Sequence, residues 1–404
     1  MIDDTSIINF NVEVLRSLFQ DIPCTWENYE SIQSFVADNF TQYLIRTRLF
    51  QGWLGEKLKQ NSSLPTRICS GVEKAIQYYL SGAHSDAYLQ LESLLPFIDS
   101  SLQNLCVDSS PTGLAFGFRG RVVKDDNFIP SRAEMFHIPF EKRHLVREQR
   151  YGAQGVPAIY LGSSIYDCYL ELDRPPIEDF FVSYFCFSQN KSGEYDPNNI
   201  RLIDLTAPKS DSARAGLLVY YVLKDEPKYI EMLEKLYHQI ILWPLMKTCS
   251  LIRKYPAAPF QQEYIIPSLL FQLCVRRSNI MGIKYDTTKK INLNRHIYSY
   301  AMQNIAIPAH NIAEKGHCSF LSSSLLLTEP LAVKNTTIRN DIKSTKGFTN
   351  HGLPILSDMD SSSADYEIIR TFDSLTMVFN NMIDEMINDG NTDLIKPLSG
   401  WRED

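Results

Sequence analysis

The sequence lacks the short motifs that identify most nucleotide-binding proteins and hydrolases. Its 404 residues contain neither Gly-x-Gly-x-x-Gly nor Gly-x-x-x-x-Gly-Lys-Ser/Thr, so neither a Rossmann-type turn nor a Walker-type phosphate loop is expected. A Gly-x-Ser-x-Gly elbow is also missing, which argues against an α/β-hydrolase. Any chemistry must come from a less common arrangement of residues.

Paired cysteines and long apolar runs are missing as well. The eight cysteines are scattered, with no Cys-x-x-Cys pair, which is typical of reduced thiols in a cytosolic protein. The densest apolar run, residues 240–246, is too short to span a membrane and contains Pro244. The first residues are acidic where a secretory signal is basic. We therefore expect a cytoplasmic protein with no membrane partner.

Metal ligands and an excess of basic residues are also missing. The candidate ligands are too loosely spaced for a metal site and are better interpreted as surface or core residues: His137, His144, His310, His317 and Cys318. The net charge is −7, which argues against a protein that coats DNA or RNA. We expect no metal and no nucleic-acid partner.

What is present divides the chain into three parts. Residues 1–105 show only helical patterns and are predicted to form an all-helical N-terminal domain. Residues 106–333 mix strands and helices without regular alternation, which predicts an α+β domain. Residues 334–404 comprise a polar linker followed by an amphipathic helix at 365–388. That helix is expected either to dock on the body or to bind a partner.

Hydrophobic periodicity and chain breakers place the individual elements. Helices are expected at 10–19, 32–58, 72–80, 87–105, 211–251 and 264–276. Strands are expected at 114–123, 158–161, 180–187, 200–205, 280–285, 304–308 and 325–333. The helical segment at 211–251 is expected to kink or break at Trp243–Pro244.

The stretch at 149–173 is the most informative part of the chain. A short apolar strand ends just after Tyr160, Gly162 breaks it, and Ser163 or Ser164 can cap the helix that follows. The apolar stripe of this helix consists of Ile165, Cys168, Tyr169 and Leu172. Its polar stripe consists of Ser164, Asp167 and Glu171. The polar stripe is either an ordinary solvated face or one wall of a site.

Three arginines complete the candidate site. Arg119 and Arg121 alternate with apolar residues and small residues, so they share one face of the expected strand. Two guanidinium groups on one face require anions, either protein carboxylates or the phosphates of a ligand. Arg150, followed by Tyr151, is a third such group. Arginines for a diphosphate, tyrosines for a flat ring and a carboxylate for a cationic sugar suit cleavage of the nicotinamide–ribose bond of NAD.

At these positions the sequence resembles the RES-domain family. That family has a tyrosine followed four residues later by a serine and eleven residues later by a glutamate, a spacing that Tyr160, Ser164 and Glu171 match. Its two arginines, one after an aromatic residue and one before, correspond to Arg119 and Arg150. The resemblance covers about residues 110–330.

The resemblance implies a fold similar to that of ADP-ribosyltransferases, with a mixed β-sheet core. Members of the family are bacterial toxins that degrade NAD by hydrolysis or phosphorolysis, or that ADP-ribosylate a protein, and many are controlled by an antitoxin. The helical parts at 1–105 and 365–388 lie outside the family's domain. They could inhibit, sense or oligomerise, so an inhibitory or activating protein partner and self-association are both candidates, in toxin–antitoxin or anti-phage defence.

The combined prediction is an NAD-consuming effector in which NAD is the substrate. The expected catalytic residues are Glu171, which stabilises the oxocarbenium, Arg119 and Tyr160. The expected substrate-binding residues are Arg119, Arg150, Tyr151, Tyr160, Ser164 and Arg121. One alternative is a mono-ADP-ribosyltransferase that uses the same NAD pocket for a protein target. The other is a non-catalytic interaction module that uses its helical parts.

Overall fold

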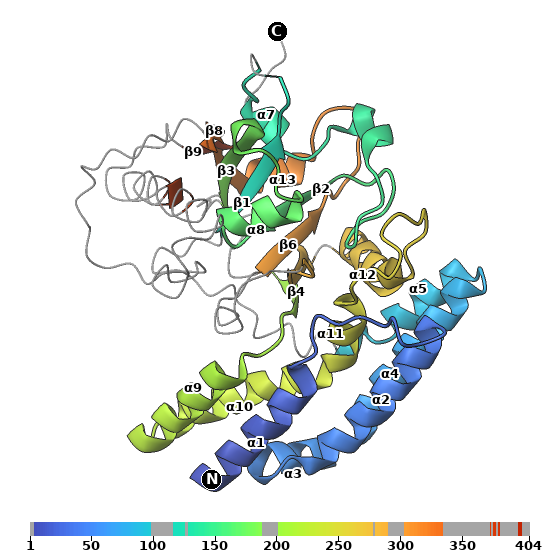
Figure 1. Cartoon of the computed structure of the whole chain (residues 1–404), viewed down its shortest axis with the longest axis vertical. Helices are drawn as coiled ribbons and strands as arrows, with labels where there is room; N and C mark the ends of the chain where they lie inside the picture. Colours follow the sequence, from blue (N-terminus) through green and yellow to red (C-terminus); the bar gives the residue numbers. More distant parts are fainter. Residues whose placement is uncertain are drawn as a thin grey trace. The chain divides into compact units, whose positions relative to one another are not determined.

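The computed structural model describes residues 4–97, 116–125, 128–187, 201–277, 279–289, 303–333, 372, 375, 376, 379 and 395–397. The chain forms two units whose segments interleave along the sequence. The helical unit comprises residues 1–105, 149–151 and 203–273. The sheet unit comprises residues 106–148, 152–202 and 274–404. The predicted α+β class is confirmed (Figure 1).

The helical unit begins with five helices: α1 (Thr5–Phe19), α2 (Ile32–Arg46), α3 (Gly52–Gln60), α4 (Ser63–Leu80) and α5 (His84–Glu92). The prediction of one long helix at 32–58 is wrong, because the chain turns between α2 and α3. Phe50 is extended and Gly52 has a φ of 57°, a conformation that favours glycine. The helix expected at 72–80 begins earlier, because α4 starts at Ser63 and Pro65 fits its first turn.

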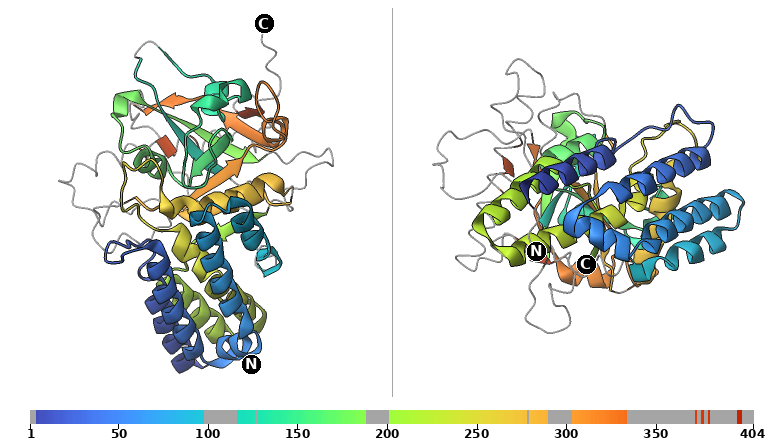
Figure 2. Two further views of the ribbon diagram at one scale, coloured as in Figure 1. Left: turned by 90° about the vertical axis from the view of Figure 1, so that its right-hand side faces the viewer. Right: turned by 90° about the horizontal axis from the view of Figure 1, so that it is seen from below.

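The second half of the helical unit comes from a distant part of the sequence. It contains α9 (Ser210–Leu223), α10 (Glu226–Ile241), α11 (Trp243–Cys249) and most of α12 (Ile265–Arg276). The predicted break at Trp243–Pro244 is confirmed as the start of α11. The expected domain at 106–333 is therefore interrupted, because residues 203–273 pack with the N-terminal helices: α9 against α1, and α10 against α3 (Figures 1 and 2).

Aromatic and polar contacts hold this unit together across the sequence gap. The ring of Tyr43 on α2 stacks on Trp243 at 4.9 Å, and its hydroxyl donates to the carbonyl of Ile240 at 2.9 Å. The indole of Trp26 donates to the buried carboxylate of Glu263 at 2.8 Å. No helix within the described ranges is long and apolar enough to cross a membrane.

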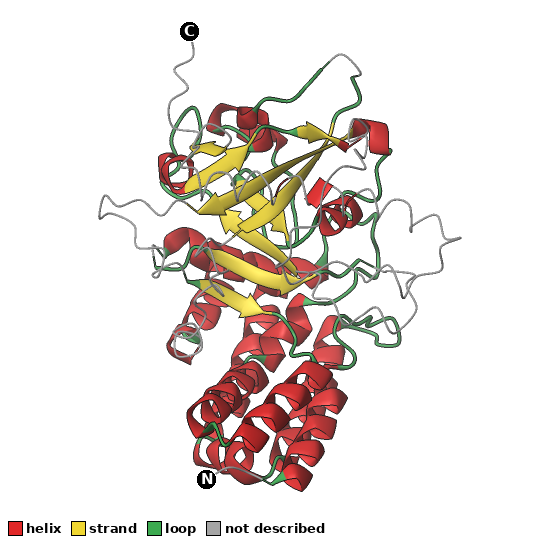
Figure 3. Cartoon of the chain, turned by 90° about the vertical axis from the view of Figure 1, so that its left-hand side faces the viewer, coloured by secondary structure: helices red, strands yellow, loops and turns green. Residues whose placement is uncertain are grey.

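The strands of the sheet unit gather in one sheet (Figure 3). They are β1 (Phe116–Val122), β2 (Ala158–Gly162), β3 (Phe180–Phe187), β5 (Gly282–Asp286), β6 (Gln303–Pro308), β7 (Leu325–Thr328), β8 (Leu331–Ala332) and β9 (Ile395–Pro397). Their order is β5-β6-β2-β1-β3-β7-β9, and β8 also pairs with β3. The expected strand at 325–333 is thus two strands. β4 (Leu202–Leu205) spans the boundary between the units.

Pairing along the sheet is uneven at its centre. β1 and β3 are antiparallel over seven residue pairs, and β2 and β6 over five. β1 and β2 share one pair in register among the described residues, Phe118 with Gly162. The two halves of the sheet therefore meet at one described pair, and the predicted residues Arg119 and Tyr160 lie near that pair on β1 and β2.

Helices and one aromatic cluster cover the sheet. α8 (Ile165–Glu171) lies against β1 and β2, and α7 (Arg132–Met135) lies against β1 (Figure 1). α13 (Ser319–Ser324) precedes β7. The aromatic cluster consists of Phe118, Tyr166, Tyr169, Phe180, Tyr184, Phe372 and Phe379, all of them buried.

The C-terminal part of the chain contributes to that cluster. Residues 372, 375, 376 and 379 are helical, and the ring of Phe372 lies 5.3 Å from that of Tyr169, centroid to centroid. The ring centroids of Phe379 and Phe118 lie 5.7 Å apart. The described residues of the predicted amphipathic helix at 365–388 therefore dock on the body, one of the two outcomes expected from the sequence. The predicted linker at 334–365 lies outside the described residues.

Candidate functional site

The turn between β2 and α8 is built as the sequence predicted. Ser164 is the N-cap residue: its hydroxyl accepts from the amide of Asp167 at 3.1 Å, and the Asp167 carboxylate accepts from the amide of Ser164 at 2.9 Å. This reciprocal pair satisfies two amides at the helix start. Gly162 is required before it, because a Cβ there would lie 2.9 Å from that of Asp167. The Ser164 side chain therefore has a structural task beside any role in binding.

Asp167 is the most deeply buried carboxylate of the site, with 1% of its surface exposed. Its Oδ2 also accepts from the Ser163 hydroxyl at 2.5 Å, and Oδ1 has no hydrogen-bond partner among the described residues. Burial raises the pKa of Asp167 to about 7, against the lowering effect of its serine bonds. Glu171, one turn along the helix, raises this pKa further. Burial therefore favours the protonated form of Asp167 more than that of an ordinary carboxyl group.

Glu171 ends α8 and is held by two other segments. Its Oε1 accepts from the hydroxyl of Thr287, just after β5, at 2.7 Å, and from the side-chain amide of Asn304 on β6 at 2.8 Å. A half-buried carboxylate with two donors on one oxygen has a fixed position. Sequence reasoning missed Thr287 and Asn304, because they are separated from Glu171 by 116 and 133 residues.

Arg119 on β1 carries the buried cation of the site. Its Nη1 is buried and has no partner among the residues that the structure describes. Burial lowers the pKa of Arg119 to about 10. Tyr160 and Cys168 act to raise this pKa, and the positive charge of Arg121 lowers it further. A buried guanidinium without a full set of partners is costly, and an anion that reached Nη1 would offset that cost.

Tyr160 and Arg121, the predicted residues nearest to Arg119, have different interactions. Burial raises the pKa of the Tyr160 phenol, and the positive charge of Arg119 opposes this increase. Arg121 shares the strand face of Arg119, as predicted, and pairs in register with Phe181 where Arg119 pairs with Ser183. The guanidinium of Arg121 donates to the carbonyl of Glu134. Arg121 thus has a protein partner, whereas the Nη1 of Arg119 has none among the described residues.

Electrostatic interactions link neighbouring members of the predicted set in the sheet unit. Tyr160 interacts with Arg119, Arg119 with the Cys168 thiol, and Cys168 with Asp167. Asp167 in turn interacts with Glu171. Arg119, Tyr160, Asp167 and Glu171 thus lie on β1, β2 and α8, which are neighbouring elements of the sheet unit.

Arg150 and Tyr151 belong to the other unit. The guanidinium of Arg150 donates to the carbonyl of Cys249 at 3.1 Å and lies 5.0 Å from the ring centroid of Tyr264. Tyr151 is buried and contacts the thiol of Cys249 by a hydrogen bond. Both partners belong to the helical unit. The short segment 149–151 thus contributes to the helical core, a placement that the local motif did not indicate.

His137, one of the candidate ligands, has structural surroundings. His137 is buried, its Nε2 accepts from the amide of Cys318 at 2.9 Å, and burial lowers its pKa to about 4. This side chain is a core histidine, one of the two interpretations made from the sequence. Among the described residues, no group of three or more histidine, cysteine, aspartate or glutamate side chains is arranged to hold a metal ion.

Comparison with known proteins gives one informative match. Over 358 residues the chain is 27% identical to a protein of Bacillus subtilis (strain 168) named "Putative toxin YopC". The match covers 86% of this chain and 75% of that protein. No protein-family model and no solved structure matches the chain.

Proposed function

We propose that this protein is a toxin that consumes NAD by cleaving its nicotinamide–ribose bond. The toxin role is supported by the similarity to the Bacillus protein, which extends over most of both chains. The chemistry is supported by one observation above all: a half-buried arginine whose buried Nη1 has no partner among the described residues lies in the same unit as a carboxylate fixed by two donors. Anion recognition and stabilisation of a sugar cation need these two groups.

In the proposed reaction the bond between the ribose C1′ and the nicotinamide nitrogen breaks, and its electron pair leaves with the nicotinamide. The positive charge passes from the pyridinium ring to the ribose, which becomes an oxocarbenium ion. Water then attacks C1′ and loses a proton, or phosphate attacks directly. The fixed Glu171 carboxylate is worth most when the positive charge is on the sugar, because only then is the contact fully formed.

The roles of the other residues follow from their surroundings. Arg119 would bind a phosphate oxygen of NAD with its unpartnered Nη1, which offsets the cost of its burial. Tyr160, beside Arg119, would pack on the nicotinamide end. Asp167 and Ser164 hold the start of α8 and thereby the direction in which Glu171 leaves the helix.

The test is to incubate the purified chain with NAD, with and without phosphate, and to follow free nicotinamide by NMR. We expect turnover in the wild type and a loss of about 10²–10³-fold in Glu171→Ala and in Arg119→Ala. Glu178→Ala and Arg147→Ala change exposed residues of the same unit and serve as matched controls. Turnover of Glu171→Ala within threefold of wild type would refute the role of Glu171.

The acceptor can be identified in the same experiment. Dependence on phosphate indicates phosphorolysis, and turnover without phosphate indicates hydrolysis. NAD labelled in its ADP-ribose part, added to a cell lysate, detects transfer to protein. Label on a protein band that is lost with Glu171→Ala would show the mono-ADP-ribosyltransferase alternative to be correct.

A further inference from the structure

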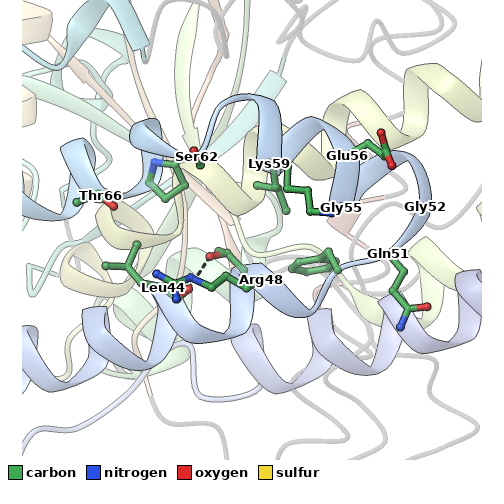
Figure 4. A pocket seen from close by; sticks show the side chains of 13 residues that line it. Leu44, Arg48, Gln51, Gly52, Gly55, Glu56, Lys59, Ser62 and Thr66 are labelled. Atoms are coloured by element: carbon green, nitrogen blue, oxygen red, sulfur yellow. Dashed lines mark hydrogen bonds between the residues drawn. The ribbon is translucent and has the colours of Figure 1, made fainter.

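A cavity lies wholly within the helical unit, apart from the residues of the proposed NAD site. It has a volume of about 630 Å³ and is bordered by the end of α2, the turn into α3 and the start of α4. Figure 4 shows its lining residues. This volume lies within the range of natural small-molecule sites, roughly 300–1,000 Å³.

The lining combines an apolar floor with a charged rim. Phe50, Leu58 and Pro65 are buried and form the floor. Arg48, Glu56 and Lys59 are exposed and form the rim. Figure 4 shows Arg48 and Lys59 entering from opposite walls of the pocket. An apolar surface with a few converging polar groups is the usual composition of a ligand site.

Neither rim cation forms an ion pair in the part of the chain that the structure describes. The contrast with their near neighbours is direct. Arg46 donates to the carbonyl of Ser17 at 2.8 Å, and Lys57 pairs with Glu234 and lies over the ring of Trp53. Two positions further along the chain, Arg48 and Lys59 have no such contacts and border the cavity instead.

The charges that line the cavity are unequal. Two cations, Arg48 and Lys59, face a single carboxylate, that of Glu56. The electrostatic balance favours a negatively charged ligand.

We infer that this cavity binds a small organic anion, a phosphate ester of about mononucleotide size with an apolar or flat group. The anion would lie between Arg48 and Lys59, and the flat group would contact the floor at Phe50. This site is independent of the proposed NAD chemistry, because all its residues belong to the helical unit.

The test uses AMP as the probe and isothermal titration calorimetry as the readout, with the full chain. Adenosine and inorganic phosphate are run in parallel, because they separate the two halves of the ligand. All titrations are done in wild type and again in Arg119→Ala, which removes binding at the proposed NAD site. We expect AMP to bind both proteins. Adenosine and phosphate should each bind at least tenfold more weakly than AMP.

Charge reversal then locates the site. Arg48→Glu and Lys59→Glu, made in both backgrounds, are each expected to weaken AMP binding at least tenfold. Lys74→Glu reverses an exposed charge on α4 away from the cavity and is expected to leave binding unchanged. Circular dichroism melts confirm that each variant is folded.

Three outcomes would overturn the inference. They are no AMP binding to wild type, binding that disappears with Arg119→Ala alone, and equal weakening by Lys74→Glu. The second would place AMP in the NAD site and leave the NAD proposal standing. Absence of NAD turnover with AMP binding intact would refute the proposed function but not this site.

Discussion

Buried polar side chains have different surroundings in the helical unit and in the sheet unit. Within the described residues, the buried side-chain atoms that have no partner include Arg119 Nη1, Asp167 Oδ1, Ser183 Oγ and His310 Nε2, all in the sheet unit. The described part of the helical unit contains no such atom. Its buried Trp26, Tyr43 and Glu263 all form hydrogen bonds.

The two units thus differ in whether the fold supplies a partner to each buried polar atom. A buried polar atom without a partner costs about 1–3 kcal/mol, so folds retain few of them. In the sheet unit such atoms occur on β1 and α8, at Arg119 and Asp167, which are elements of the proposed site. In the helical unit, polar contacts such as that between Trp26 and Glu263 join segments distant in the sequence.

The largest expected effect tests the sheet unit. Arg119→Met replaces the buried guanidinium with an apolar side chain of similar length. We expect NAD turnover to fall about 10²–10³-fold, while the free energy of unfolding stays equal or increases, because an incompletely paired buried charge is removed. Turnover by NMR and urea unfolding by circular dichroism measure the two quantities. A large loss of stability would mean that Arg119 is a structural residue.

The next effect tests the helical unit. Glu263→Ala leaves the indole of Trp26 and the amide of Lys254 without their acceptor. We expect the free energy of unfolding to fall by about 3 kcal/mol. Glu30→Ala, at an exposed position of the same unit, is the control and should have no measurable effect. Unchanged stability in Glu263→Ala would remove the contrast between the units.

A smaller effect should appear in the dependence of stability on pH. The pKa of Asp167 is about 7 in the folded chain, above its ordinary value of 3.8. Between about pH 4 and pH 7 the folded chain holds a proton that the unfolded chain releases, so this group makes stability fall as pH rises through that window. Urea unfolding at pH 5 and pH 7.5 should show a loss on the order of 1–3 kcal/mol. Asp167→Asn should make this loss smaller, and an identical loss would contradict the assignment.

The smallest effect concerns Ser164. Ser164→Ala removes the cap of α8 and should lower the free energy of unfolding by about 1 kcal/mol. Ser164→Asn keeps a capping oxygen and should restore that stability. NAD turnover of the same variants separates two roles of the serine. If Ser164→Ala lowers turnover and Ser164→Asn restores it, the serine acts through the helix cap. If turnover stays low while stability returns, the hydroxyl itself contacts NAD.

Local features of the site could be predicted from the sequence, and long-range ones could not. The strand, the glycine break and the cap at Ser164 follow from residue types at neighbouring positions. The shared face of Arg119 and Arg121 follows from the period of a strand. The donors to Glu171 lie more than a hundred residues away, and one sequence holds no signal for such a pairing. Periodicity also shows which face of α9 or α10 is buried, but not against which helices it packs.

The aromatic cluster has a consequence for how the protein is made. Phe118 and Tyr169 are synthesised early, whereas Phe372 and Phe379, which pack on them, come about 200 to 260 residues later. At roughly 5–20 residues per second, a ribosome needs on the order of 10–50 s to cover that distance. During this interval the nascent chain carries β1 and α8 with their aromatic surface uncovered. A chain that ends prematurely before residue 372 keeps that surface exposed to water, which makes it a target for chaperones and proteases.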